Sequence, residues 1–112
     1  MANYATHIYM ELIVEDKAVK WFEEEVGRAE GAGIRFKTMI YGSSPVQDSF
    51  ALQVEPTEPH SPIVTFTSDN GLLFFIEKDD EWFFKEHDLV VSFNDELNEP
   101  KYIYRKDGVD LN

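Results

Sequence analysis

The sequence predicts an α+β, β-rich fold of about seven strands, with one main helix near the N-terminus and one short helix. Three observations lead to this prediction. Most apolar segments alternate with polar residues, which is typical of strands. Only one long segment has helical spacing. Ser68-Asp69-Asn70-Gly71 has the composition of a hairpin turn, because Asn-Gly accepts positive φ at little cost.

The N-terminal part of the chain predicts one strand followed by the main helix. Residues 8–14 alternate between apolar and polar side chains, which indicates a strand. In residues 16–26 the apolar side chains recur every three or four positions, and acidic residues at the start suit the helix dipole. Gly27 follows where a C-terminal cap is expected. The face that we expect to lie against the sheet consists of Ala18, Trp21, Phe22 and Val26.

Strand patterns dominate the rest of the chain. The segments with these patterns are residues 34–41, 50–54, 63–67, 72–76, 89–93 and 102–105. Residues 72–76 are apolar on both faces, which favours a central strand. The three prolines within residues 55–62 predict a rigid connection between two strands. Residues 79–87 predict a short helix with Trp82 and Phe83 packed inward, and the last two strands are expected to pair around the acidic turn 94–100.

Charge and composition exclude several classes of function. The chain has 112 residues, the size of one domain, and its 22 acidic against 10 basic residues give a net charge of −12. Such a surface repels the phosphates of nucleic acids and of anionic membranes. The absence of cysteine excludes a disulfide, a thiolate metal site and a cysteine nucleophile. Since the sequence shows neither a membrane span nor a signal peptide pattern, we expect a cytoplasmic location.

The polar residues that could carry chemistry are scattered along the sequence. The histidines do not have the spacing of a metal site, and Ser43 is not in a Gly-x-Ser-x-Gly turn. Three adjacent carboxylates at residues 79–81 lack the pattern of a calcium loop and suit a helix N-terminus. We therefore expect no enzymatic activity, metal or cofactor. The alternative is an enzyme that uses His87 or Ser43, which a hydrolase screen would reveal.

The polar loop at residues 41–48 is the predicted binding site. It follows a well-patterned strand, and loops held by a rigid scaffold commonly carry binding contacts. Its side chains suit hydrogen bonding to a partner or ligand, and no general base is evident beside them. The candidate binding residues are Tyr41, Gly42, Ser43, Ser44 and Gln47. The alternative is an ordinary strand connection in which Gly42 and Pro45 shape the turn.

Several segments together resemble one known family. They are Val14-Glu15-Asp16-Lys17-Ala18-Val19-Lys20-Trp21-Phe22, Gly33-Ile34-Arg35-Phe36, Ile40-Tyr41-Gly42-Ser43-Ser44-Pro45-Val46, Phe74-Phe75-Ile76-Glu77 and His87-Asp88-Leu89-Val90-Val91-Ser92-Phe93. The pattern resembles the HesB-like family of HesB/YadR/YfhF-type proteins, which includes the A-type iron–sulfur carriers, and is closest to its cysteine-free uncharacterised branch. The resemblance covers residues 10–110. It implies an N-terminal extension at residues 1–9 and a single HesB-like pseudo-barrel domain at residues 10–112.

The resemblance also limits the expected function. Carriers bind their cluster through one cysteine in the loop after the second strand and a Cys-x-Cys near the C-terminus. This chain has Ser43 or Ser44 in that loop and no cysteine at its C-terminus, and hard oxygen ligands do not replace thiolates for a cluster. The resemblance thus implies a non-enzymatic accessory of iron–sulfur cluster assembly, with a partner in that machinery, that does not carry the cluster. The alternative is a small protein-interaction or ligand-binding module unrelated to iron.

Overall fold

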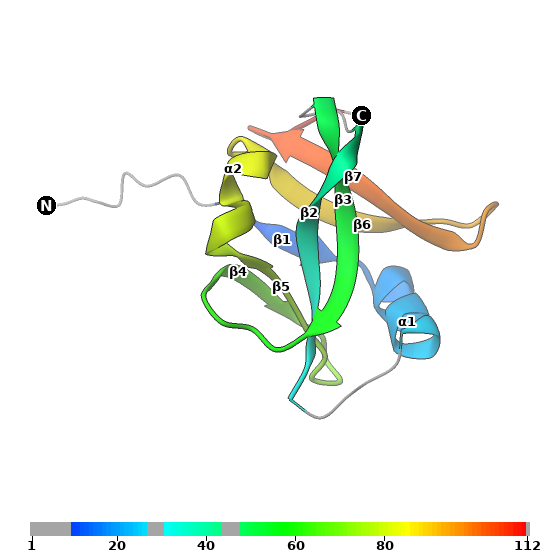
Figure 1. Ribbon diagram of the computed structural model, residues 1–112. Coiled ribbons are helices and arrows are strands. Elements are labelled where there is room, and N and C mark those ends of the chain that lie inside the picture. Colours follow the sequence, from blue (N-terminus) through cyan, green and yellow to red (C-terminus); the bar gives the residue numbers. More distant parts are fainter. Residues whose placement is uncertain (1–9, 27–30, 44–47, 112) are drawn as a thin grey trace, which may run out of the picture.

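The computed structural model describes residues 10–26, 31–43 and 48–111, and their strands form two four-stranded sheets (Figure 1). The elements in chain order are β1 (Leu12–Val14), α1 (Asp16–Glu25), β2 (Gly33–Ser43), β3 (Asp48–Thr57), β4 (Pro62–Thr67), β5 (Leu73–Glu77), the 3-10 helix η2 (Lys78–Asp80), α2 (Glu81–Phe84), β6 (Asp88–Asn94), β7 (Glu99–Lys106) and β8 (Val109–Asp110). The predicted α+β, β-rich class is confirmed.

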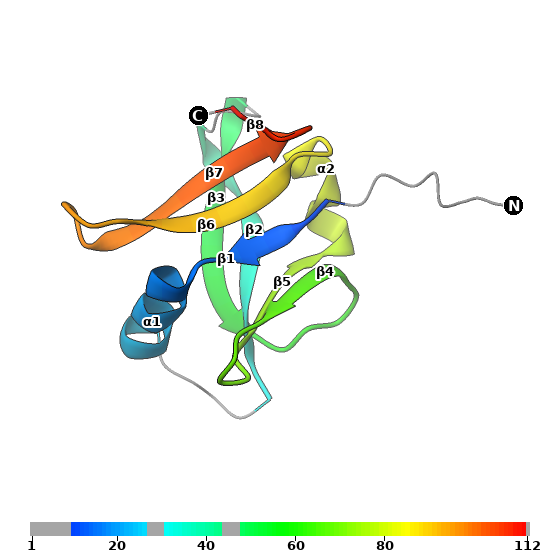
Figure 2. The same cartoon turned by 180° about the vertical axis from the view of Figure 1, so that it is seen from behind.

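The two sheets have the strand orders β1-β6-β7-β8 and β3-β2-β5-β4, and neither closes on itself among the described strands. Each sheet contains one parallel pair, β1 with β6 and β2 with β5, and its other pairs are antiparallel. The edge strands β1 and β4 lie side by side where the two sheets meet (Figure 2). This arrangement leaves β3 and β8 as the outer strands at the other ends of the sheets.

The hydrophobic core fills the space between the sheets and is rich in phenylalanine. Phe22 of α1 has edge-to-face contacts with Phe36 of β2 and Phe74 of β5, at ring-centroid distances of 5.9 and 5.5 Å. Phe36 and Phe74 are stacked at 6.1 Å. All three rings are fully buried. The helix is therefore held by its contact with the second sheet as well as by its packing against β6 and β7.

Helix α1 was predicted with nearly correct bounds but an incomplete buried face. It ends at Glu25, with Val26 as its C-cap, and Gly27 lies outside the described residues. Ala18 and Phe22 are fully buried as predicted, whereas Trp21 and Val26 are only partly buried. The missed core residue is Val19. The helix contacts elements of both sheets. Its buried face therefore includes Val19 in addition to the residues that the spacing of large side chains indicated.

The segment after β5 also differs from the prediction. It forms η2 and the four-residue α2, and the predicted inward residues separate, since Phe83 is fully buried but Trp82 is 50 % exposed. A helix this short presents only one inward side, which Phe83 and Phe84 occupy. Lys85 then takes a left-handed conformation and ends the helix. The inward position predicted for Trp82 is therefore wrong.

Three other local predictions have clear outcomes. The Ser68–Gly71 turn is confirmed: Gly71 has φ of 85°, and the Ser68 backbone N–H donates to the Leu72 carbonyl at 2.9 Å. The central position of β5 is confirmed by the strand order. The rigid connection predicted at residues 55–62 is shorter than expected, because β3 continues to Thr57 and includes Pro56. Proline is tolerated there because β3 is an edge strand.

Burial of two tyrosines on β7 gives a prediction at alkaline pH. Burial, together with the charge of Glu99, raises the pKa of Tyr102 from 10.0 to about 12. Burial, with a smaller contribution from Tyr102, raises the pKa of Tyr104 to about 12. For each tyrosine the pKa in the folded protein lies above its value in the unfolded chain. The contribution of the neutral phenol to the stability of the fold is therefore complete below pH 10.0, and it is lost as the pH rises toward 12.

We expect a titration of phenolate absorbance to show these two groups ionising near pH 12 in the folded protein. Tyr102→Phe and Tyr104→Phe should each remove one phenolate from that step. The urea-unfolded protein is the control, and all its tyrosines should titrate near their ordinary pKa of about 10. Titration of both side chains at that ordinary pKa in the folded protein would show that they are not buried.

Candidate functional site

The predicted binding loop is shorter in the structure than in the prediction. Strand β2 continues through Tyr41 and Gly42 to Ser43, which pairs with Asp48 at the start of β3. A register shift lies between Ile40 and Ser43. The other two candidate residues, Ser44 and Gln47, lie outside the described residues. The described parts of β2 and β3 therefore pair as far as Ser43 and Asp48, and a binding role for the segment between them stays a prediction.

His87 holds the backbone at the end of α2. Its Nδ1 lies 2.8 Å from the Phe84 carbonyl oxygen and 3.1 Å from the Lys85 carbonyl oxygen, and its backbone N–H donates to the Phe84 carbonyl at 2.9 Å. These contacts span the positions where Lys85 and Glu86 both have positive φ. Within residues 10–26, 31–43 and 48–111, no three His, Cys, Asp or Glu side chains lie together as metal ligands.

Asp80 binds β2 to the short helical segment. Its carboxylate accepts hydrogen bonds from the Arg35 guanidinium, the shorter at 2.7 Å, and from the Thr38 backbone N–H at 3.2 Å. The Asp80 and Arg35 side chains are only 9 % and 19 % exposed. Asp79 and Glu81 beside it are exposed. Of the three adjacent carboxylates that were expected at a helix N-terminus, the middle one thus forms a partly buried ion pair.

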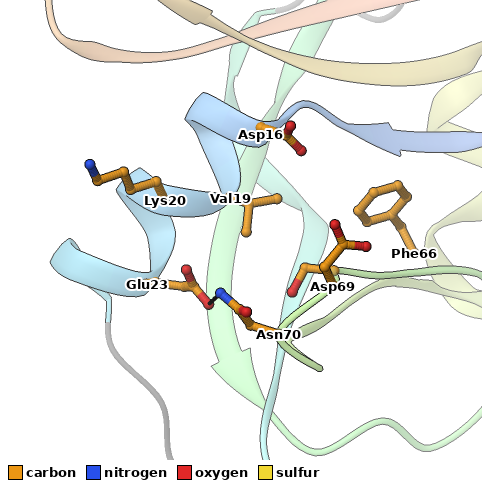
Figure 3. Close-up of a pocket in the computed structure, with 8 residues that line it drawn as sticks. Asp16, Val19, Lys20, Glu23, Phe66, Asp69 and Asn70 are labelled. Carbon is orange, nitrogen blue, oxygen red and sulfur yellow. Dashed lines mark hydrogen bonds between the residues drawn. The ribbon is translucent and has the colours of Figure 1, made fainter.

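An open groove of about 440 Å³ lies between α1 and the β4–β5 turn (Figure 3). Val19 on the helix and Phe66 on β4 face it from opposite sides, and the carboxylates of Asp16 and Asp69 lie along it. Across its lower end the Asn70 amide donates to the Glu23 carboxylate at 3.4 Å. Lys20 also lines the groove, although the end of its side chain points away from it. The groove is open and combines the apolar side chains of Val19 and Phe66 with mainly acidic ones, and sequence spacing gave no sign of it.

A second groove, of about 420 Å³, lies beside α2. Its largest side chain is the half-exposed Trp82, and Met10 contributes an apolar wall. Lys78 and Lys85 line it together with acidic residues from the same segment. It therefore offers apolar surface with charges of both signs.

The edge of β3 that no other described strand pairs with is a third feature of the surface. Among the described strands β3 pairs only with β2, from Gly33 opposite Thr57 to Ile40 opposite Phe50 without a register shift. Residues in an antiparallel pair alternate between directing their N–H and C=O groups toward the partner strand and away from it. The sequence predicted a strand here but gave no indication that it lies at an edge.

Two observations fix which β3 residues direct their backbone groups outward. Pro56 has no N–H to donate, and proline in a sheet is placed with its nitrogen facing away from the partner strand. The Thr38 N–H is bonded to Asp80, so Thr38 and Leu52, which lie opposite each other, are not a hydrogen-bonded pair. Both observations give the same parity. The N–H groups of Leu52 and Val54 therefore face the open side of the sheet, and those of Gln53 and Glu55 face β2.

The described residues offer binding surfaces, namely two grooves and a sheet edge, on a small acidic α+β domain. None of the described helices is long and apolar enough to cross a membrane. No protein-family model matches the chain, and no solved structure matches it.

Comparison with curated proteins shows the family to which the chain belongs. It is similar to the pyruvate dehydrogenase inhibitor of Bacillus subtilis (strain 168), with 36% identity over 96 residues that cover 86% of this chain and 100% of that protein. It is also similar to the uncharacterised protein SSP1406 of Staphylococcus saprophyticus, with 26% identity over 95 residues that cover 83% of this chain and 97% of that protein. The chain belongs to the family of the Bacillus subtilis protein.

Proposed function

We propose that this protein inhibits pyruvate dehydrogenase by binding to it. The observation that carries this proposal is the 36% identity to a protein named pyruvate dehydrogenase inhibitor, over that protein's whole length. An inhibitor that binds an enzyme needs complementary surface and no chemistry of its own, so we propose that the protein is not an enzyme. This is the protein-interaction alternative of the sequence analysis, with the dehydrogenase as the partner.

The charge of the protein supports binding to a basic surface of the enzyme. The chain carries a net charge of −12, and opposite charge on a partner accelerates association and favours the correct orientation. Such binding weakens as salt screens the charges. We further propose a cytoplasmic location.

The test is an activity assay of the purified pyruvate dehydrogenase complex from the same organism, followed by NADH formation. We expect the purified protein to reduce the rate in a saturable, dose-dependent way, and we expect the inhibition to weaken between low and high salt. Lactate dehydrogenase, which is also read through NADH, is the control and should be unaffected. An unchanged rate at a large molar excess of the protein would contradict the proposed function.

We propose as a second candidate that the protein is HesB-like and assists iron–sulfur cluster assembly without carrying the cluster. Support comes from the order of the elements: a strand, the main helix, paired strands, a short helix and a final hairpin follow in the order that the resemblance implies. The HesB-like pseudo-barrel and an assembly partner are parts of this proposal. Anaerobic purification from the native cell, with metal analysis and identification of co-purifying proteins, tests it.

The two candidates predict different results in that purification. A cysteine desulfurase or scaffold protein in the preparation, with no stoichiometric iron on this chain, would support the second candidate. Subunits of pyruvate dehydrogenase would support the first. Iron and sulfide in stoichiometric amounts on the monomeric protein would contradict the statement that it does not carry a cluster.

A further inference from the structure

We propose that the protein docks on the dehydrogenase by β-strand addition, with the open edge of β3 receiving an extended segment of the enzyme. This inference rests on the proposed function, since it names the surface and the binding mode for that partner. Strand β3 has ten residues and lies at the end of its sheet (Figure 1). An open strand edge is a row of backbone donors and acceptors that another strand can satisfy.

The backbone geometry defines the docking positions. The N–H groups of Leu52 and Val54 face outward. Both Pro56 and the hydrogen bond between Thr38 and Asp80 require this alternation along β3. The carbonyl groups of Leu52 and Val54 face the same side, because both backbone groups of such a residue share one direction. An added strand can therefore form two complete pairs of hydrogen bonds here, and Pro56 limits it at one end.

The side chains define the chemistry of the added strand. Leu52 and Val54 are partly buried and pack against the core, so residues opposite them would extend its apolar face. Gln53 is exposed, and the Glu55 carboxylate is 40 % exposed although it lies 3.6 Å from the Lys37 ammonium. The structure therefore fits a segment with alternating residues, apolar on one face and basic or uncharged polar on the other.

Charge favours the enzyme over a second copy of this chain as the occupant of the edge. Two copies would each bring a net charge of −12 to the contact, and this repulsion opposes a symmetric pairing of two β3 strands. A basic segment experiences attraction instead. Strand β3 also lacks the lysines and the inward-pointing charges that commonly protect an edge, within its described residues 51–57.

The test compares two substitutions at one position in binding to the purified pyruvate dehydrogenase complex. Val54→Pro removes the outward N–H and places a ring against the added strand, whereas Val54→Ala shortens the side chain but keeps the N–H. We expect Val54→Pro to weaken binding at least about tenfold, and Val54→Ala to weaken it less than about threefold. Circular dichroism and thermal unfolding check that both variants fold.

Amide hydrogen exchange provides a measurement that needs no variant. In the free protein the amides of Leu52 and Val54 should exchange quickly, and those of Gln53 and Glu55 should be protected by their bonds to β2. In the complex with the dehydrogenase, peptides that span β3 should gain protection, as measured by mass spectrometry. This experiment decides the proposal even if Val54→Pro does not fold.

Each outcome distinguishes the docking mode from the proposed function. Binding of the parent protein without inhibition contradicts the proposed function alone. Inhibition with equal affinity for Val54→Pro, or with unchanged exchange of β3, contradicts the docking mode alone. Failure of the parent protein to bind contradicts both. Protection of Leu52 and Val54 that increases with concentration in the free protein, with a doubled mass, would show that a second copy occupies the edge and would overturn the docking mode.

Discussion

Phe22→Ala is expected to lower the free energy of unfolding by about 3–5 kcal/mol, the range for truncating a buried aromatic side chain. Phe22 is fully buried and contacts rings on both β2 and β5, so its removal leaves a cavity where α1 meets the sheet. A domain of this size is stable by about 5–15 kcal/mol, so the loss is a large share of the total. Urea unfolding at equilibrium measures it.

Trp21→Ala is the matched control on the same helix. Trp21 is only partly buried and contacts Phe22 edge-to-face at 5.1 Å. We expect Trp21→Ala to lower the free energy of unfolding by about 1–2 kcal/mol, because the partly buried Trp21 side chain removes less of its apolar surface from water than a fully buried ring does. The sequence pattern alone placed Trp21 in the buried face together with Phe22 and would give its removal a loss of about 3–5 kcal/mol. A larger loss for Trp21 than for Phe22 would mean that the helix is rotated from the orientation in the structure.

Asp80→Ala is expected to lower the free energy of unfolding by about 3–5 kcal/mol, the cost of removing one partner of a buried ion pair. The substitution leaves Arg35, whose side chain is 19 % exposed, without its carboxylate partner, and the Thr38 N–H without its acceptor. Both groups lie on β2, so the damage falls on the central region of the second sheet. Urea unfolding of the parent and the variant measures the difference.

Two controls separate the ion pair from a general effect of the substitution. Asp79→Ala removes the adjacent exposed carboxylate and should change stability by less than about 0.5 kcal/mol. The double substitution of Asp80→Ala with Arg35→Met should cost less than the sum of the two single substitutions, because no buried charge is then left unpaired. Additive single effects would show that Arg35 and Asp80 do not act together.

The structure confirms the predicted elements that depend mainly on residues close together in the sequence. The helix at residues 16–26, the turn at Asn70-Gly71 and the central strand near Phe74 each depend on neighbouring residues, and each is present. The errors occur where a side chain depends on distant elements. Trp82 was expected to pack inward together with Phe83, but the short α2 has one inward side, which Phe83 and Phe84 fill.

The candidate site was less predictable than the fold. The sequence indicated a polar loop after the second strand, and Tyr41 to Ser43 proved to belong to the strand itself. The grooves depend on which helix and which turn meet across the sheet, so no spacing along the chain indicates them. The outward direction of the Leu52 and Val54 amides depends on register. A change of register by one residue would turn these amides toward β2 instead. A sequence pattern does not define the ends of a strand to within one residue, so it does not predict this direction.

The sequence by itself determined the class of fold, the acidic charge, the absence of thiolate chemistry and most of the strands, because these follow from composition and from periods of two and 3.6 residues. Only the tertiary structure decided the two parallel pairs, the burial of Asp80 against Arg35 and the position of β3 at an edge. Each of these joins residues far apart in the chain. Their physical cause is the packing of two sheets around one core, which selects among many pairings that the local patterns allow equally.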